Sequence, residues 1–345
     1  MTLKEELETL RGEPIEAFNG DPMDIPCIET SDVEKLCKHP VVSVHMITYN
    51  HEPYIRQAIE GVMMQKADFE FELVIGEDCS QDKTREICFE YQKKYPDKIR
   101  VLWWHENVSK LGGNGRRVTA RCRGEFIAFC EGDDYWTDPL KLKKQKELLE
   151  ASKAIGCVAF NTILEKNGRF MENIYERVKF VGVKDFEKHY FHTSTYFFDF
   201  REFRAMMLRY SQMPYWFDTI MFQCMASVGK IALLPEIVSV RRYTGTGIAT
   251  SLSDIGRIIL NLSQNIPLYL YGPRIYRKFF ARGILTSASG YFYLRRNQNV
   301  MVNNEEKERG RVMSRIFYSV FLGMLYSPYA WKRFLYMMKW RFLRV

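Results

Sequence analysis

The run EGDD at residues 131–134 is the sharpest chemical feature of this chain. Carboxylates one residue apart at the end of a strand can face one site if the chain turns there, and Gly132 makes that turn cheap. Anionic groups held close together repel one another unless a cation lies between them. Mg²⁺ or Mn²⁺, bound by one or two carboxylates with phosphate oxygens and water in the other positions, relieves that repulsion. The alternative is a solvated acidic turn before a helix that starts near Asp138-Pro139.

Two further polar clusters follow apolar runs, at Tyr49-Asn50 and at Glu77-Asp78. A carboxylate at Glu77 or Asp78 can accept a hydrogen bond from a base N–H or a ribose hydroxyl, as acidic residues do in nucleotide-binding sheets. The alternative is a local turn in which Asp78 and Ser80 bond to neighbouring backbone groups. A second acidic cluster at the same predicted edge favours the nucleotide-binding interpretation.

Buried strands and amphipathic helices alternate around these clusters. Apolar, β-branched runs predict strands at residues 41–48, 71–75, 99–104 and 126–130, with helices between them. This alternation predicts an α/β fold with a mostly parallel central sheet flanked by helices. Ligands bind such sheets at the carboxyl ends of the strands. Because all three polar clusters follow strand ends, we expect them to meet at one edge.

Four segments between residues 41 and 251 carry a family resemblance: VSVHMITYNHEPYI, VIGEDCSQDKT, FCEGDDYWTDPLKLKKQ and FDTIMFQCMASVGKIALLPEIVSVRRYTGTG. Together they resemble the family 2 glycosyltransferases of the bacterial polysaccharide type, whose GT-A fold is a single nucleotide-binding α/β domain. Any one segment alone would be a weak signal, whereas the four together are specific.

The resemblance implies roles for the residues near the strand ends. Thr48, Tyr49 and Glu52 would lie around the nucleotide. Either Glu77 or Asp78 would hold its base.

The family's DxD motif falls on residues 131–133 of this chain. By the resemblance, Asp133 is a ligand of Mn²⁺ or Mg²⁺, and Glu131 contacts the ribose or the metal. Glu131 in the first position is a departure from strict DxD, which makes its implied role less secure than that of Asp133.

Asp218, within YWFDTIMFQCMASVG, stands where such enzymes carry their catalytic base. Inverting transfer is a single in-line displacement at the anomeric carbon, so the attacking hydroxyl must lose its proton to a carboxylate within hydrogen-bond reach. Without the resemblance, Asp218 would be interpreted as a helix N-cap.

Many relatives carry a His after the final core strand that completes the metal site. This chain has RRYTGTG there, with Thr244 in the matching place. Arg241 or Arg242 is expected to grip the diphosphate instead, because a guanidinium suits phosphate oxygens. His189 and His192 are interpreted as packed or surface side chains and not as ligands.

Composition and cysteine usage bound the class of protein. The chain has 345 residues, a formal net charge of +8, and eight cysteines without a CxxC pair or a nearby His at zinc-ligand spacing. We therefore expect reduced thiols and a cytoplasmic protein. The first 18 residues lack the apolar core of a signal peptide. No stretch reaches the roughly 18 to 20 apolar residues of a membrane span. The expected location is the cytosol or the inner face of the cytoplasmic membrane.

Three regions are expected along the chain: a polar extension at residues 1–39, a GT-A catalytic domain at 40–250 and a helical region at 251–345. Residues 311–345 contain no acidic residue, and their apolar runs alternate with basic side chains. Such basic, aromatic helices bind anionic membrane surfaces. The alternative is a helical pair that folds onto the catalytic domain. Bulky aliphatic residues among the basic ones argue against binding to nucleic acid.

The resemblance, together with the acidic turn, implies a metal-dependent inverting glycosyltransferase, with inversion implied by the resemblance alone. Its donor would be a UDP-linked sugar, and its acceptor a growing polysaccharide or lipid-linked saccharide of a bacterial envelope. A nucleotidyltransferase would instead need a Gly-rich loop with a basic residue after the first strand, where this chain has TYNHEP. A catalytically dead binding protein of this fold would be expected to lack Asp133 or Asp218, and both are present.

Overall fold

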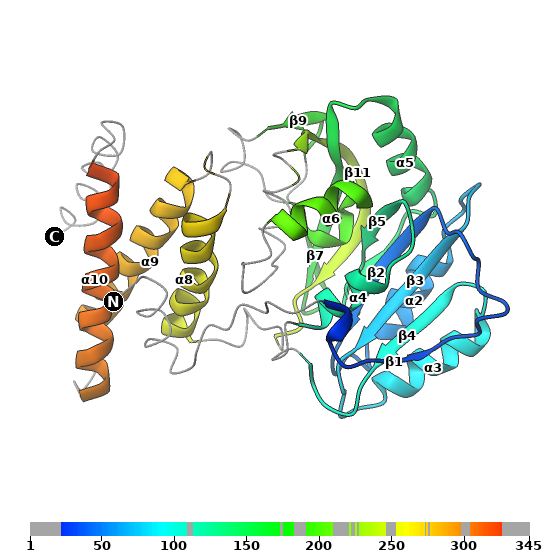
Figure 1. Cartoon of the computed structure of the whole chain (residues 1–345), viewed down its shortest axis with the longest axis horizontal. Coiled ribbons are helices and arrows are strands. Elements are labelled where there is room, and N and C mark those ends of the chain that lie inside the picture. The colour runs from blue at the N-terminus through cyan, green and yellow to red at the C-terminus, as the bar shows by residue number, and fades with distance from the viewer. Residues whose placement is uncertain are drawn as a thin grey trace. The chain divides into compact units, whose positions relative to one another are not determined.

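A computed structural model describes residues 22–108, 113–172, 175–182, 191–209, 228–245, 253–272, 277–297 and 304–325, with single positions between some of these ranges. The chain divides into two compact units. One runs from Phe18 to Gly245, and the other consists of Met1–Ala17 with Thr246–Val345. Figure 1 shows the sheet of the first unit and the helices of the second.

The first unit is built on one mixed sheet. Its described strands are β1 (Ile28–Thr30), β2 (Val42–Thr48), β3 (Phe71–Glu77), β4 (Ile99–Trp103), β5 (Phe126–Phe129), β6 (Tyr135–Trp136), β7 (Ile155–Lys166), β8 (Arg169–Glu172), β9 (Lys179–Val181), β10 (Phe197–Asp199) and β11 (Lys230–Arg242). They lie in the order β1-β4-β3-β2-β5-β10-β7-β11-β6, with β8 beside β7 and β9 beside β11. The neighbours among β4, β3, β2 and β5 are parallel, and so are β7 and β11. β10 runs antiparallel between β5 and β7.

Helices cover both faces of this sheet. They are α2 (Ile55–Met63), α3 (Thr84–Lys94), α4 (Asn114–Arg121), α5 (Lys141–Ala151) and α6 (Phe200–Arg209). Met46 of β2 shares one core cluster with Ile59 of α2 and Ile87 of α3. Side chains alternate along a strand, so His45 faces the other side, where its Nε2 donates to the Gly115 carbonyl of α4 at 3.0 Å. The predicted α/β class with a mostly parallel core is confirmed.

A buried ionic cluster holds the amino ends of the central strands together. Glu72 of β3 is fully buried and accepts a hydrogen bond from Ser43 Oγ of β2 at 2.7 Å. It also accepts from Arg100 of β4 at 3.2 Å and from Arg123 at 2.8 Å. Arg100 makes two further bonds of 2.8 Å to Glu29 of β1. These contacts attach the short strand β1 to the edge of the sheet.

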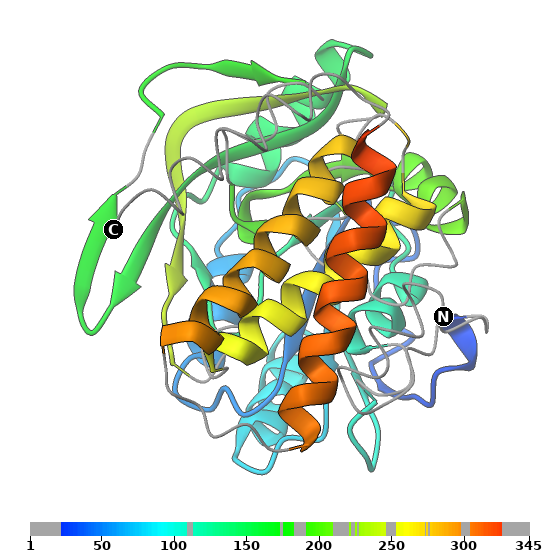
Figure 2. The same ribbon diagram turned by 90° about the vertical axis from the view of Figure 1, so that its left-hand side faces the viewer.

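The second unit contains three described helices, α8 (Asp254–Tyr271), α9 (Arg277–Asn297) and α10 (Asn304–Leu325). α8 and α10 both pack against α9 (Figure 2). Within the expected membrane-binding tail, Ile316 and Val320 of α10 are buried, whereas Tyr318 is 63% exposed. Residues 326–345 lie outside the described residues. None of the described helices is long and apolar enough to cross a membrane.

Candidate active site

The loops that follow β2 and β3 are bonded to each other at the carboxyl edge of the sheet. Asn50 donates its backbone N–H to Ser80 Oγ at 3.0 Å, and its Oδ1 accepts from the Gln81 amide at 2.8 Å. Asn50 and Cys79 both have left-handed backbone, with φ of 54° and 64°. Asn adopts this conformation at low cost. The two loops therefore form one bonded surface and not two independent flaps.

Glu52 also bonds to the loop that follows β3. Asp82 Oδ2 accepts from the Glu52 amide at 3.0 Å, and Glu52 Oε2 accepts from the Lys83 amide at 3.2 Å. Lys83 precedes α3, so the Glu52 carboxylate bonds one of the amides that are left unsatisfied at a helix start. Glu52 lies at the predicted edge with a structural partner, and its role beside a nucleotide stays a prediction.

The two carboxylates expected to hold the base are both buried. Glu77 Oε1 accepts from the Ser80 amide at 2.6 Å, and its Oε2 accepts from Arg85 Nε at 2.5 Å. Asp78 Oδ1 accepts from the Val108 amide at 2.8 Å. These bonds attach the loops after β3 and β4 to the sheet. The structure brings both acids to the predicted edge and does not test which of them contacts a base.

The turn at residues 131–134 packs against the end of β2. The Gly132 amide donates to the Ile47 carbonyl at 2.9 Å. A Cβ on Gly132 would lie 2.7 Å from Thr48 Cβ and 2.9 Å from His51 Nδ1. Thr48 is buried, and its Oγ1 lies 3.2 Å from the same His51 nitrogen. Glycine at position 132 is therefore needed for close packing, while Tyr49, one residue further, is 44% exposed.

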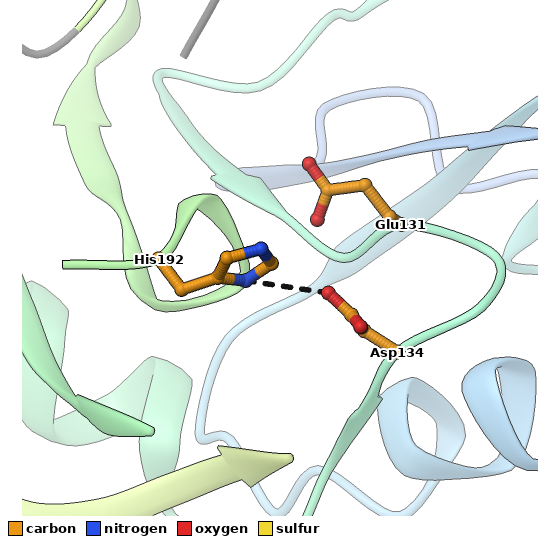
Figure 3. A group of neighbouring side chains, drawn as sticks. All are labelled: Glu131, Asp134 and His192. Carbon is orange, nitrogen blue, oxygen red and sulfur yellow. Dashed lines mark ion pairs between the residues drawn. The ribbon is translucent and has the colours of Figure 1, made fainter. Parts of the chain in front are cut away.

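The three carboxylates of this turn have different surroundings. The Asp133 side chain is 22% exposed, and its Oδ2 lies 4.0 Å from His51 Nε2. Asp134 is buried, and its Oδ2 lies 3.3 Å from His192 Nδ1. Glu131, Asp134 and His192 each offer a ligand atom within 4.8 Å of the other two. Figure 3 shows the three side chains and the ion pair between Asp134 and His192. The sequence therefore located the acidic turn, and the structure adds a histidine on each side of it.

Burial and repulsion between neighbouring carboxylates disfavour negative charge on Asp134 in this turn. Burial raises the pKa of Asp134 well above its usual range, and the negative charges of Asp133 and Glu131 raise it further. Burial lowers the pKa of His51, with Asp133 acting in the opposite direction. Burial also lowers the pKa of His192 to about 3. Mutually repelling carboxylates beside neutral imidazoles form a donor set that a divalent cation satisfies. The residues present fit such a cation.

Arg242 joins the end of β11 to the turn. Its backbone N–H donates to Asp134 Oδ1 at 2.9 Å, and its guanidinium donates to the Asp133 carbonyl at 2.9 Å. The guanidinium also donates to Gln57 Oε1 and lies 4.4 Å from the centre of the Tyr135 ring. Arg242 thus lies at the predicted edge and fixes the backbone of the turn. Its contact with a diphosphate stays a prediction.

A family model, Glycosyl transferase family 2, matches residues 43–222, which is more than half of the chain. The chain belongs to glycosyl transferase family 2. The predicted resemblance is confirmed by this match. The acidic turn, the bonded loops after β2 and β3, and the strands β3 and β5 lie within the matched residues, as does β2 from its second residue on.

Relatives of this family 2 protein match over part of their length. The chain is 43% identical over 109 residues to uncharacterized protein Rv1520 of Mycobacterium tuberculosis. The matched segment covers 32% of this chain and 31% of that protein. The chain is 32% identical over 127 residues to the putative teichuronic acid biosynthesis glycosyltransferase TuaG of Bacillus subtilis, covering 36% and 49%. The chain thus spans about a third to a half of these relatives.

A solved structure shows the same fold. The crystal structure of TarS residues 1–349 from S. aureus, in complex with UDP-GlcNAc, has a TM-score of 0.57 to this chain at 18% identity. The similarity covers 81% of each chain. At this identity the similarity shows the fold alone, and it confirms the predicted GT-A class.

Some site residues of this family 2 domain were not predicted from the sequence. His51 lies in TYNHEP, the segment at the end of the first predicted strand, and this position could have identified it as a site residue. His192 was interpreted as packed or surface. The structure buries it beside Asp134, and no spacing in the sequence points to that contact. The predicted base Asp218 and the other interpreted histidine, His189, lie outside the described residues.

Proposed function

We propose that this family 2 protein is a metal-dependent inverting glycosyltransferase. It transfers a sugar from a UDP-linked nucleotide sugar to a saccharide or lipid-linked acceptor in cell-envelope polysaccharide synthesis. The observation that carries the proposal is the packed acidic turn at residues 131–134, where the Asp133 carboxylate is accessible at the carboxyl end of the parallel strands. The catalytic region is proposed to span residues 40–250, and 251–345 to form an accessory helical region.

Each residue at the edge has a proposed role. Asp133 and Glu131 bind Mn²⁺ or Mg²⁺, and the cation supplies positive charge that stabilises the departing diphosphate. The exposed Tyr49 flanks the nucleotide beside the buried Thr48. Glu77 or Asp78 meets the base, since both carboxylates lie buried at this edge of the sheet.

Three further residues are proposed to support the transfer. Glu52 shapes the nucleotide loop by bonding the start of α3. Arg242 holds the turn that carries Asp133 through the Asp133 carbonyl, and places positive charge near the diphosphate. Asp218 accepts the proton of the acceptor hydroxyl as the glycosidic bond forms.

The likeness to TuaG supports the envelope setting, and the TarS complex bears on the donor. TuaG is named for teichuronic acid biosynthesis, and TarS was crystallised with UDP-GlcNAc. The GT-A fold therefore accommodates a UDP-sugar. The assay below identifies the donor.

The deciding assay is release of nucleoside diphosphate from a panel of UDP-, GDP- and dTDP-sugars, with Mn²⁺, Mg²⁺ or EDTA. We expect one donor to be hydrolysed slowly, EDTA to abolish this, and Asp133→Ala to reduce it by at least about 100-fold, since a metal ligand contributes several kcal/mol to charge stabilisation. Asp68→Ala is the matched control, because the Asp68 carboxylate is exposed and pairs only with Lys143 among the described residues. Turnover that is unaffected by EDTA and by Asp133→Ala would contradict the proposal.

We also propose that the protein attaches peripherally to the inner face of the cytoplasmic membrane through the basic end of its chain. The charge of residues 326–345, which contain five basic and no acidic residues, supports this. Sedimentation with vesicles that contain anionic lipid, against vesicles of phosphatidylcholine alone, tests it. Equal binding to both, or to neither, would count against an electrostatic attachment.

A further inference from the structure

His192 lies beside the acidic turn although it is far from it in sequence. It precedes the 3-10 turn η4 (Thr193–Thr195) and is 7% exposed. The strand β10 that follows η4 pairs with β5, the strand that leads into the turn. This pairing is what brings the imidazole within 4.8 Å of ligand atoms on Glu131 and Asp134.

The hydroxyl groups behind His192 locate its proton. Ser194 Oγ lies 2.9 Å from His192 Nδ1 and donates to Ser239 Oγ at 3.1 Å. Ser239 Oγ donates to Thr162 Oγ1 at 2.9 Å, and Thr162 Oγ1 donates to the Ser239 carbonyl at 3.0 Å. A carbonyl oxygen only accepts, so each hydroxyl uses its single proton along this chain. With the hydroxyl protons directed this way, Ser194 Oγ presents a lone pair to the imidazole, which favours a proton on Nδ1.

Asp134 and the Ser194 amide lie at the same ring nitrogen. Asp134 Oδ2 lies 3.3 Å from Nδ1, while Asp134 Oδ1 is held by the Arg242 amide at 2.9 Å. The Ser194 amide, at 3.4 Å, would favour the opposite tautomer, but it is the longest of the three contacts at that nitrogen. With its proton on Nδ1, the ring keeps a lone pair on Nε2. Figure 3 shows that nitrogen on the side of the ring where the Glu131 carboxylate lies.

We propose that His192 Nε2 is a ligand of the divalent cation at this turn, together with Glu131. Asp134 and Ser194 are positioning residues that fix the ring and its tautomer, as carboxylates and hydroxyls behind a metal-binding imidazole commonly do. The inference rests on the proposed metal dependence and deepens it. A mixed nitrogen and oxygen donor set favours Mn²⁺ or Co²⁺ over Mg²⁺, because Mg²⁺ prefers oxygen ligands.

The test is pulsed electron paramagnetic resonance on the full chain loaded with Mn²⁺ and UDP. We expect a ¹⁴N coupling from one directly bound imidazole in the wild type and in His51→Gln, and its loss in His192→Gln. Titration should show Mn²⁺ binding weakened by about 10- to 100-fold in His192→Gln, and the preference for Mn²⁺ over Mg²⁺ reduced. Ser194→Ala keeps the imidazole and should keep the coupling, with a smaller loss of Mn²⁺ affinity.

The outcomes separate this inference from the proposed function. A coupling that survives in His192→Gln, or that disappears only in His51→Gln, would overturn the assignment to His192. Mn²⁺ bound by the wild type without any ¹⁴N coupling would overturn it as well, and would leave metal dependence intact. If the wild type binds no Mn²⁺ with or without UDP, the proposed metal dependence itself fails. Should His192→Gln not fold, His51→Gln decides: a surviving coupling supports His192, and a lost one overturns it.

Discussion

Gly132→Ala should disable the acidic turn at a modest cost in stability. The added Cβ would lie 2.7 Å from both Cβ and Oγ1 of Thr48 and 2.9 Å from His51 Nδ1. Non-bonded carbons prefer about 3.5 to 4.0 Å, so the turn or the end of β2 must move by roughly 1 Å. Thr48 cannot swing away freely, because it is buried and its carbonyl accepts from the Asp78 amide at 3.1 Å. Overpacking of this kind costs about 1 to 3 kcal/mol.

That strain predicts two measurable effects. The melting temperature should fall by about 2 to 12 °C, given roughly 2 to 4 °C per kcal/mol for a unit of this size. Donor hydrolysis should fall by about 100-fold, because a displacement of roughly 1 Å at a reacting site has that effect. Gly182→Ala is the matched control: its Cβ would meet no heavy atom within 4 Å, so both quantities should stay at the wild-type level.

A double-mutant cycle with Thr48→Gly isolates the steric cause. Removing Thr48 Cβ and Oγ1 should make Gly132→Ala cost less stability than it does in the wild type, since residues in contact couple by about 0.5 to 3 kcal/mol. Strictly additive costs, or a Gly132→Ala variant with wild-type melting temperature and turnover, would refute the packing argument for the turn.

Three further outcomes are expected elsewhere in the molecule. Glu72→Gln should destabilise the first unit by about 1.5 to 3 kcal/mol in urea unfolding, because it removes the carboxylate that accepts hydrogen bonds from both Arg100 and Arg123, while Glu29 still pairs with Arg100. Burial lowers the pKa of His45 from 6.5 to about 4, so the unfolded state binds a proton at a higher pH than the folded state does. The free energy of unfolding should therefore fall by about 3 kcal/mol as the pH drops from 6.5 to 4. His45→Gln should reduce this dependence of the free energy of unfolding on pH. Gly290 lies inside α9, and a Cβ there would lie 3.6 Å from the Ile258 side chain of α8, an ordinary contact distance. Gly290→Ala should therefore stabilise the helical unit by about 0.5 to 1 kcal/mol in thermal unfolding.

The parallel strands β2, β3, β4 and β5 could be predicted to within two residues, because continuous β-branched runs are typical of strands buried on both faces, whereas the parallel pair β7 and β11 was not assigned bounds. The run at 41–48 forms β2 from Val42 to Thr48, and the run at 126–130 forms β5 from Phe126 to Phe129. The antiparallel strand β10 could not be placed from sequence. Its position between β5 and β7 follows from tertiary pairing, and the local pattern FFD carries no information about which strands it joins.

The same limit applies to the site. The acidic turn could be predicted because polar residues follow an apolar strand. The partners of its carboxylates could not, because they arrive through pairings across the sheet. Arg242 reaches Asp134 from the end of β11, and His192 reaches it from the segment before β10. The resemblance implies a nucleotide contact for Glu52, which stays a prediction, and its bond to the Lys83 amide could not be predicted because it depends on how two loops meet.

These contacts imply that the edge is organised before any ligand binds. Glu52, Glu77 and Asp78 accept hydrogen bonds from backbone amides of neighbouring loops, which fixes those loops relative to the sheet. Asp133 differs, because its carboxylate is partly exposed and its nearest ionic neighbour among the described residues is a histidine 4.0 Å away. The edge therefore separates carboxylates that build the loops from one that can meet a ligand. On the proposed function, such a division would let a cation and a diphosphate bind without first reorganising the backbone, which is the condition for electrostatic stabilisation at low cost.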